Sequence, residues 1–328
     1  MSGYWSYALR RALQGILVII LAYVLTFTIV TVLPGDPVTT MLRDPQNGYS
    51  EEEIRQLSSY YGLDQPVLLQ LVTSLGRFLI GDFGVSLRSN TSVGGQIALA
   101  LPSTLALAGT ALVFALILAL AIGYASQYLP KRYGQGFVRS LPSLFLSVPN
   151  FVIGLLLIHV FAFGLGAFQI LKPEAPAATF FAAVALGIPV SAQIAEVLVA
   201  NLDHERSQES TVVSRARGLT HPGIFFRHLL KPSLLPVITI VALAAGELLG
   251  GSLITETVFG RNGIGTLVQK AVVSQDLPIL QATVSLAAVV FVVINFVTDL
   301  VYPLLDPRLR STGIFAMKSS KQSKEVFA

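Results

Sequence analysis

The sequence predicts an all-α polytopic membrane protein with six transmembrane helices. Of its 328 residues, 53% are hydrophobic and only 12% are charged, which is far from the composition of a soluble domain. Six apolar stretches are each long enough to cross a hydrocarbon core of about 30 Å, which takes about 20 helical residues. The period-two alternation of a membrane barrel is missing, so these stretches are predicted to be helices.

The predicted spans come in chain order with loops of unequal length. The first could instead be a secretory signal peptide, since Arg10 and Arg11 precede an apolar run. That run is too long, and no small-residue cleavage site precedes "LPGDP" (33–37), so we expect a retained span. The six spans are Ala12–Leu33, Leu101–Tyr128, Phe137–Gly166, Ala178–Ala200, Ser233–Thr255 and Ala282–Leu305.

The distribution of Lys and Arg predicts the orientation of the chain. Basic residues gather before the first span, in the loops after spans two and four, and after span six, whereas the short loops on the other side hold few. Because cytoplasmic loops of membrane proteins are enriched in Lys and Arg, both termini are predicted to be cytoplasmic.

Composition also excludes several kinds of site. The chain has no cysteine and four scattered histidines, so neither a disulfide framework nor a metal site is expected, and His159 is interpreted as a hydrogen-bonded polar residue. The net charge is +4, but aromatic residues are not interleaved with the basic ones, so nucleic-acid binding is not predicted.

The first external loop is predicted to contain a helix. In "SEEEIRQLSSYYGL" (50–63), Ser50 and Glu53 have the spacing of a capping box. Ile54, Leu57 and Tyr61 then follow at helical spacing and form one apolar face. This arm could meet an extracytoplasmic partner, or it could be a lid on the outer rim of the bundle.

A polar and basic island, "RARGLTHPGIFFRHLLKPSLLP" (215–236), separates spans four and five. Ser207 is predicted to cap a helix with Glu209 in its first turn, and Gly218 to end that helix in a left-handed conformation. Pro222 suits the first position of a second short helix, which Pro232 would close.

The second of these helices is predicted to be amphipathic. Its apolar stripe is formed by Phe225, Phe226, Leu229 and Leu230, with Arg227, His228 and Lys231 off it. An interfacial segment that only anchors to lipid headgroups is the alternative interpretation of the island.

Eight motifs in order give the chain its resemblance to a known family. They are "LPGDP" (33–37), "YGLDQPVLLQ" (61–70), "GDFGVSL" (81–87), "LPSTLALA" (101–108), "VPNFVIGLLL" (148–157), "SRARGL" (214–219), "ETVFGRNGIGTLVQKAVVSQDLPILQATV" (256–284) and "DLVYPLLDPRLR" (299–310). The sequence resembles the transmembrane permease subunits of binding-protein-dependent ABC importers, specifically the first permease of dipeptide, oligopeptide and nickel systems.

The resemblance implies a type I importer (MetI-like) permease fold in the bacterial inner membrane. It divides the chain into a first helix and external arm (1–94), a permease core (95–305) with a cytoplasmic coupling loop (201–231), and a cytoplasmic tail (306–328). That loop would dock on an ATPase subunit. The coupling residues implied are Ser207, Glu209, Arg215, Ala216, Arg217, Gly218, Leu219 and Pro222.

The coupling stretch departs from the usual family pattern. The family's "RTARAKG" reads "VVSRARG" (212–218) here, with Val212 in place of a frequent arginine or glutamate and Arg217 in place of a lysine.

"GRNGIGT" (260–266) has no lysine after its glycines, so a phosphate-binding loop is not predicted and the chain is not expected to be an ATPase.

The resemblance also implies the partners and the cargo. The partners would be a second permease, expected to be a paralogue, two ATPase subunits that bind ATP and Mg, and an extracytoplasmic solute-binding protein. The expected substrates are dipeptides or oligopeptides, with nickel or a metal chelate as the alternative. The alternative functional class is a secondary transporter, which should show inverted repeats. Halves 1–166 and 167–328 do not correspond, so the importer permease is favoured.

Three acidic residues lie within predicted spans, where ionisable groups are costly and commonly functional. Glu196, which stands where relatives often have arginine, and Glu247, within "GELLGG", are candidates for the translocation pathway. For Glu247 the alternative is a protonated side chain hydrogen-bonded to a neighbouring helix. Asp299 is interpreted as structural, with Arg308 and Arg310 as possible partners.

Overall fold

Helices form almost all of the chain that the computed structural model describes, which comprises residues 2–32, 50–61 and 65–305. Within those ranges there is no strand. Five described helices are long and apolar enough to cross a membrane, and six if a bent pair is counted as one span. The predicted all-α class is therefore confirmed, whereas the predicted tail 306–328 lies outside the described residues.

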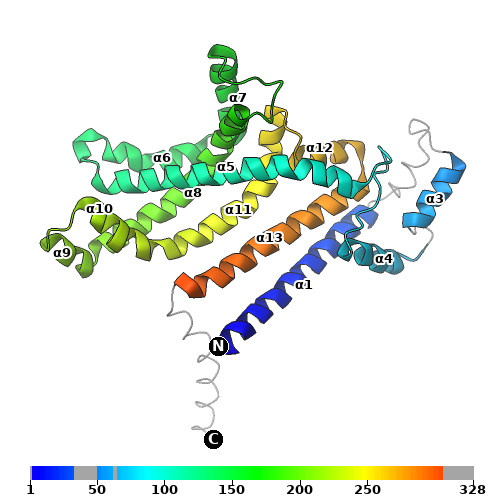
Figure 1. Cartoon of the computed structure of the whole chain (residues 1–328), viewed down its shortest axis with the longest axis horizontal. Coiled ribbons are helices and arrows are strands. Elements are labelled where there is room, and N and C mark those ends of the chain that lie inside the picture. The colour runs from blue at the N-terminus through cyan, green and yellow to red at the C-terminus, as the bar shows by residue number, and fades with distance from the viewer. Residues whose placement is uncertain (1, 33–49, 62–64, 306–328) are drawn as a thin grey trace, which may run out of the picture.

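The helices follow one another in the order drawn in Figure 1. They are α1 (Ser2–Val32), α3 (Glu51–Tyr61), α4 (Val67–Leu79), α5 (Val93–Tyr128), α6 (Gln135–Ser147), α7 (Asn150–Leu157), α8 (Pro176–Ser207), α9 (Glu209–Ala216), α10 (His221–Ile224), α11 (Lys231–Phe259), α12 (Ile264–Ser274) and α13 (Leu277–Leu305). π-Helical residues Ile158–Gly164 continue α7, and π-helical residues Phe225–Leu230 join α10 to α11.

The core is centred on the contact between α5 and α8. On α5, Ala111, Ala115 and Ala119 recur at four-residue spacing and are all fully buried. On α8, a Cβ atom at Gly187 would lie 2.9 Å from the backbone oxygen of Ala111. Small residues let the two backbones approach closely, as is common where membrane helices pack without a hydrophobic driving force.

We expect Gly187→Val to destabilise the protein, because its side chain must push α5 away from α8. The expected loss is about 1–3 kcal/mol, measured as a lower midpoint of thermal unfolding in detergent. Gly109→Val is the matched control, since nothing lies within 4 Å of a Cβ atom at Gly109. Equal midpoints for the two variants would contradict the close approach.

A second layer lies beside this core. α11 packs against α8 and α5, whereas α1 and α13 pack against each other and run side by side along one margin (Figure 1). The apolar side chains of α1 are largely exposed, including Leu13, Leu17, Leu21 and Leu25. A helix with such an exposed surface suits the lipid-facing edge of a membrane protein.

The third predicted span, 137–166, is not one straight helix. The chain bends by 98° between α6 and the helix that starts at Asn150. Val148 is extended, with φ −104° and ψ 121°, because the ring of Pro149 disfavours the helical conformation of the preceding residue. The prediction of a single span was wrong in this respect, since hydropathy averages over such a break.

The other predicted spans are confirmed as helices with shifted ends. α1 begins at Ser2 rather than Ala12, and α8 continues to Ser207 rather than ending near Ala200. These extensions bring polar residues of α8 to the segment that follows it, where the candidate site begins.

Candidate functional site

Residues 201–231, called the coupling segment here, turn sharply at Gly218. This glycine has φ +76°, and the N–H of Leu219 donates to the carbonyl of Ser214 at 3.4 Å after α9 has ended. This is the hydrogen bond of a Schellman cap, which needs a left-handed residue that glycine adopts without strain. The predicted conformation of Gly218 is confirmed.

The predicted cap at Ser207 is wrong. Ser207 is the last residue of α8, and its hydroxyl donates to the carbonyl of His204 at 2.7 Å rather than accepting from α9. Glu209 does begin α9, as expected. The junction is instead held by Thr211, which is buried and whose hydroxyl donates to the carbonyl of Glu205 at 2.9 Å.

The predicted end of the second helix at Pro232 is also wrong. From His221 the chain stays helical through the π-helical residues 225–230 into α11, whose first turn contains Pro232. The π-helical stretch ends at Leu230, two positions before the proline, whose missing N–H would disturb an α-helical ladder. Pro222 lies in the first turn of α10, close to its predicted position.

Aromatic contacts fasten α10 to the end of α5. The rings of Tyr128 and His221 stack with centroids 4.9 Å apart. Phe225 is buried and meets Tyr124 edge to face at 5.1 Å. Leu229 is buried as well, but Phe226, predicted to share this stripe, is 60% exposed. A displacement of α10 would therefore be passed directly to α5.

A polar cluster that the sequence did not predict ties three helices together beside the coupling segment. Arg139 of α6 binds both carboxylate oxygens of Asp203 of α8, at 2.8 and 3.0 Å. The Gln127 amide of α5 donates to the same carboxylate at 2.8 Å, and Arg206 donates to Gln127 Oε1 at 3.0 Å. Bidentate arginine contacts fix orientation, so the ends of α5, α6 and α8 form one unit.

The implied coupling residues lie together along this short segment. Arg217, Gly218 and Pro222 are exposed and Leu219 is half-buried. Arg215 and Ala216 belong to α9, but their side chains are outside the described part. A set of exposed side chains around a rigid turn could contact a separate protein.

The three intramembrane acids do not come together. Glu196 on α8 and Glu247 on α11 are both exposed on this chain, and neither makes a hydrogen bond or ion pair within the described ranges. Asp299 pairs with Arg11 of α1 at 3.3 Å, whereas Arg308 and Arg310 lie outside the described residues. The hydrogen-bonded interpretation of Glu247 therefore has no support in the structure.

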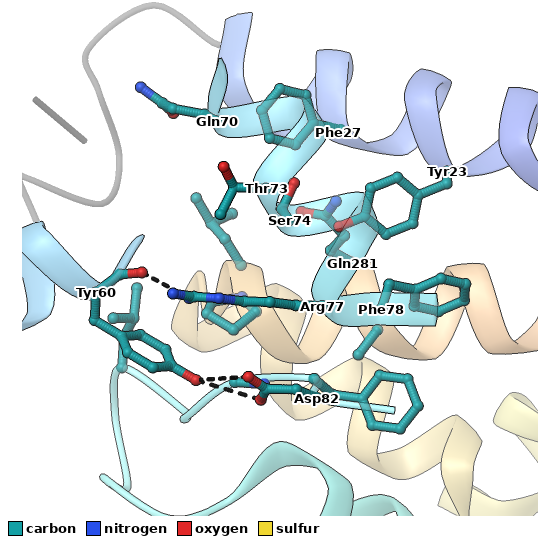
Figure 2. Close-up of a pocket in the computed structure, with 16 residues that line it drawn as sticks. Tyr23, Phe27, Tyr60, Gln70, Thr73, Ser74, Arg77, Phe78, Asp82 and Gln281 are labelled. Carbon is teal, nitrogen blue, oxygen red and sulfur yellow. Dashed lines mark hydrogen bonds between the residues drawn. The ribbon is translucent and has the colours of Figure 1, made fainter. Parts of the chain in front are cut away.

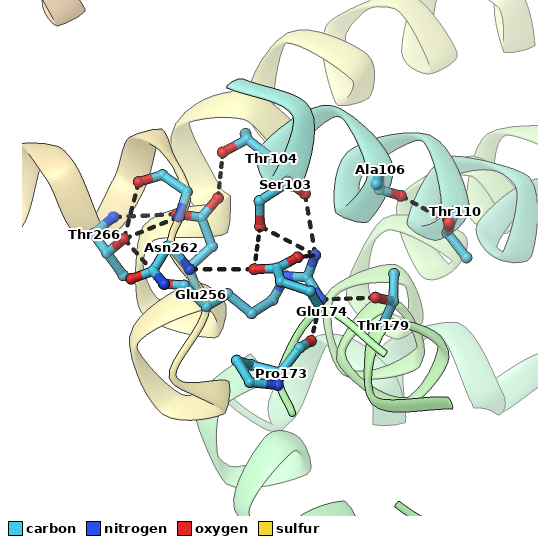
Figure 3. A network of polar contacts seen from close by, with 12 residues as sticks. Ser103, Thr104, Ala106, Thr110, Pro173, Glu174, Thr179, Glu256, Asn262 and Thr266 are labelled. Carbon is cyan, nitrogen blue, oxygen red and sulfur yellow. Dashed lines mark hydrogen bonds and ion pairs between the residues drawn. The ribbon is translucent and has the colours of Figure 1, made fainter. Parts of the chain in front are cut away.

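A buried polar network at the opposite ends of the core helices was also missed from sequence (Figure 3). Glu256, at the end of α11, is fully buried. Its carboxylate accepts from the Thr104 hydroxyl at 2.6 Å and from the Thr266 N–H at 3.1 Å. Because Thr104 belongs to α5 and Thr266 to α12, one carboxylate joins three helices.

Arg261 completes this network. Its side chain is 1% exposed, and it pairs with Glu174 at 2.6 Å. It also donates to the Pro173 carbonyl at 2.6 Å and to the Thr179 hydroxyl at 2.8 Å. Burial lowers the pKa of Arg261, and the Glu174 and Glu256 carboxylates oppose that shift, so the guanidinium remains charged.

The glycines of "GRNGIG" (260–265) are explained by the same network. A Cβ atom at Gly263 would lie 2.3 Å from a carboxylate oxygen of Glu256, and one at Gly265 would lie 2.4 Å from the Cα atom of Leu253. The turn thus wraps directly over the buried acid. The sequence signal that could have indicated this network is the acid Glu256 and the base Arg261 beside the glycine-rich turn.

The arm predicted to be external begins with α3, which contacts the next helix of the same loop. The predicted capping box is confirmed, since the N–H of Ser50 donates to Glu53 at 2.8 Å and the Glu53 N–H donates to the Ser50 hydroxyl at 3.3 Å. Tyr60 fixes α3 in place, because Arg77 donates to its carbonyl at 2.6 Å and its hydroxyl lies 3.3 Å from Asp82. These contacts hold the end of α3 against α4 and Asp82, which belong to the same loop, so the lid and the partner interpretations both stay predictions.

No group of three His, Asp or Glu side chains that could hold a metal ion occurs among residues 2–32, 50–61 and 65–305.

Residues 111–311 match the family described as the binding-protein-dependent transport system inner membrane component. The chain is 31% identical over 305 residues to the glutathione transport system permease protein GsiC of Shigella boydii serotype 4 (strain Sb227) and to that of Escherichia coli (strain K12). Identity to GsiC of Salmonella paratyphi A is 30%. In each case the alignment covers 93% of this chain and 99% of the relative.

Proposed function

Because the chain belongs to the family of inner membrane components of binding-protein-dependent transport systems, we propose that it forms half of an ATP-driven import pathway for short peptides. It is a multi-pass permease subunit of the peptide and glutathione type, and not itself an enzyme. The 31% identity to a glutathione permease, over an alignment that covers 93% of the chain, carries the proposal. Glutathione is a tripeptide, which favours peptides over nickel or metal chelates.

The proposed partners follow from the same membership. A permease of an ABC importer works with a further permease, ATPase subunits and a binding protein. We propose that the second permease is a paralogue, that two ATPase subunits bind ATP and Mg, and that the solute-binding protein is extracytoplasmic. In this arrangement both termini and the coupling segment face the cytoplasm, as the distribution of Lys and Arg favours.

The coupling segment is the proposed contact with an ATPase subunit. The Schellman turn at Gly218 and the stacking of His221 on Tyr128 support this role, because a displacement is transmitted only through rigid elements. The contact residues proposed are Glu209, Arg215, Ala216, Arg217, Gly218, Leu219 and Pro222, with Ser207 ending the preceding helix.

The test of substrate class uses the assembled complex in vesicles, with its binding protein on the outside and ATP inside. We expect ATP-dependent uptake of labelled dipeptides, glutathione or longer peptides. Uptake of Ni²⁺ chelates alone would replace peptide with metal chelate as the cargo. Uptake by this chain without ATPase subunits would overturn the importer proposal in favour of secondary transport.

We also propose that Glu247 lines the pathway, because it is exposed on this chain and makes no hydrogen bond or ion pair in the described part. Glu247→Gln is expected to change peptide uptake several-fold and to leave the unfolding midpoint unchanged, since no described hydrogen bond is lost. Glu196→Gln, tested in parallel, examines the second candidate. A lower unfolding midpoint with normal uptake would contradict this proposal and indicate that Glu247 has a structural role.

A further inference from the structure

A cavity of about 130 Å³ lies between the external arm and the bundle (Figure 2). Its walls come from the C-terminal half of α1, from α3 and α4, from residues 82–87 and from the first turns of α13. The volume is roughly ten times what a single water molecule needs. None of the contacts proposed for coupling or for the pathway uses this space.

One side of the cavity is aromatic. Tyr23 and Phe27 of α1 are almost fully buried along its wall. Tyr23 contacts Phe78 with ring centroids 4.9 Å apart, and Phe78 contacts Phe83 at 5.8 Å. Mutually packed rings form a stiff apolar surface, which suits a hydrocarbon chain.

The other side carries one cation and one anion. The cap that ends α4 brings them together, since the N–H of Asp82 donates to the carbonyl of Arg77 at 3.0 Å and Gly81 has φ +82°. Among the described residues no ion pair joins the two side chains. Tyr60 lies between them, its ring 4.2 Å from the Arg77 guanidinium and its hydroxyl at Asp82.

Burial and the Asp82 carboxylate both raise the pKa of Tyr60, so its hydroxyl stays protonated and continues to separate the two charges. The Asp82 carboxylate also accepts from the Gly84 N–H at 3.0 Å. The rim therefore presents separate positive and negative groups.

Gln281 of α13 also lines the cavity. Its Nε2 atom is buried and makes no hydrogen bond to any described residue. A buried amide donor without an acceptor costs free energy, so a ligand that brings a carbonyl oxygen would be favoured here.

The surface around the cavity is apolar. α4 exposes Val67, Leu68, Val72 and Leu79, and α1 exposes Leu21, Leu25 and Ile29. An amphipathic helix beside a lipid-facing helix is typical of the boundary between headgroups and acyl chains. A ligand at this boundary would combine a hydrocarbon chain with a charged head.

We propose that this cavity binds a zwitterionic phospholipid of the outer leaflet. The phosphate would lie at Arg77, the ammonium group at Asp82, an ester carbonyl at Gln281, and part of one acyl chain against Tyr23 and Phe78. The choice of leaflet rests on the orientation in the proposed function. A zwitterionic peptide would match the two charges, but it would leave the exposed apolar surfaces of α4 and α1 unused.

The test follows tryptophan quenching by brominated lipids. The chain has a single tryptophan, Trp5, so Trp5→Phe with Phe78→Trp places the only tryptophan of this subunit at the cavity. The complex is reconstituted in phosphatidylethanolamine and phosphatidylglycerol vesicles, with one lipid at a time brominated on its acyl chains. We expect brominated phosphatidylethanolamine to quench at least twofold more than brominated phosphatidylglycerol at equal mole fraction.

The controls separate a specific site from general lipid contact. Trp5→Phe with Leu21→Trp reports from an exposed position and should be quenched equally by both lipids. Arg77→Gln and Asp82→Asn should each remove the preference at Phe78→Trp, with the unfolding midpoint checked for each. Phe27→Trp is a second reporter in case Phe78→Trp does not fold.

Equal quenching by both lipids at the cavity reporters would overturn the proposal. Relief of quenching by an added short peptide would overturn it in favour of a peptide site. The measurement needs neither ATP nor uptake, so a protein that binds the lipid but imports no peptide would contradict the proposed function and leave the lipid site intact.

Discussion

Gly218→Pro is expected to abolish peptide uptake and to remove the stimulation of ATPase activity by the binding protein, while the complex still assembles in the membrane. Proline fixes φ near −65°, whereas Gly218 has φ +76°, so the Schellman turn cannot form. Because proline cannot adopt the native backbone conformation at this position, we expect the substitution to displace α9 relative to α10. The measurements are uptake and ATP hydrolysis by the same vesicles.

Gly218→Ala gives a graded version of this experiment. Nothing lies within 4 Å of a Cβ atom at Gly218, so the only penalty is the left-handed backbone, about 1–2 kcal/mol. We expect partial loss of uptake, several-fold rather than complete.

Gly134→Pro is the matched control for the coupling role. Gly134 also has positive φ, +95°, with nothing within 4 Å of its Cβ position, and it lies on the same predicted side of the membrane. It is in the turn before α6, outside the coupling segment. Uptake should be largely retained in this variant. Normal uptake by Gly218→Pro, or equal losses at the two glycines, would contradict the coupling assignment.

Gly218 also shows why part of the site could be predicted from sequence. A left-handed helix end is a local property, and glycine is the residue that tolerates it, so the pattern of apolar residues and breakers was sufficient. The same reasoning failed at Ser207 and Pro232. At Ser207, predicted to start a helix, α8 ends instead, and at Pro232, predicted to end one, the helix continues into α11. Tertiary packing overrode both local signals.

The network around Glu256 could not be predicted in this way. Its hydrogen bonds join residues far apart in the chain, such as Thr104 with Glu256 and Pro173 with Arg261. They exist only because the ends of α5, α8 and α11 meet. The bend at Pro149 was missed for a different reason, since hydropathy sums over a window and ignores the conformation of the residue before a proline.

Arg261→Met is expected to cause the largest loss of stability. The side chain is 1% exposed, and its removal leaves the fully buried Glu256 without the cation that offsets its charge. Losing one partner of a buried charge cluster typically costs about 3–5 kcal/mol. For a chain of this size the unfolding midpoint should fall by roughly 5–10 °C, measured in detergent.

Glu174→Gln is the matched control, because the Glu174 side chain is 48% exposed and its pairing with Arg261 is partly screened by solvent. We expect a loss of about 1 kcal/mol or less for this variant. The double variant Glu256→Gln with Arg261→Met removes both buried charges and should recover part of the loss, since the uncompensated anion is gone. Similar midpoints for Arg261→Met and Glu174→Gln would show that the buried cation does not hold the helix ends together. Uptake should fall in proportion to the folded fraction, which separates this structural role from the effect of Gly218→Pro on a folded complex.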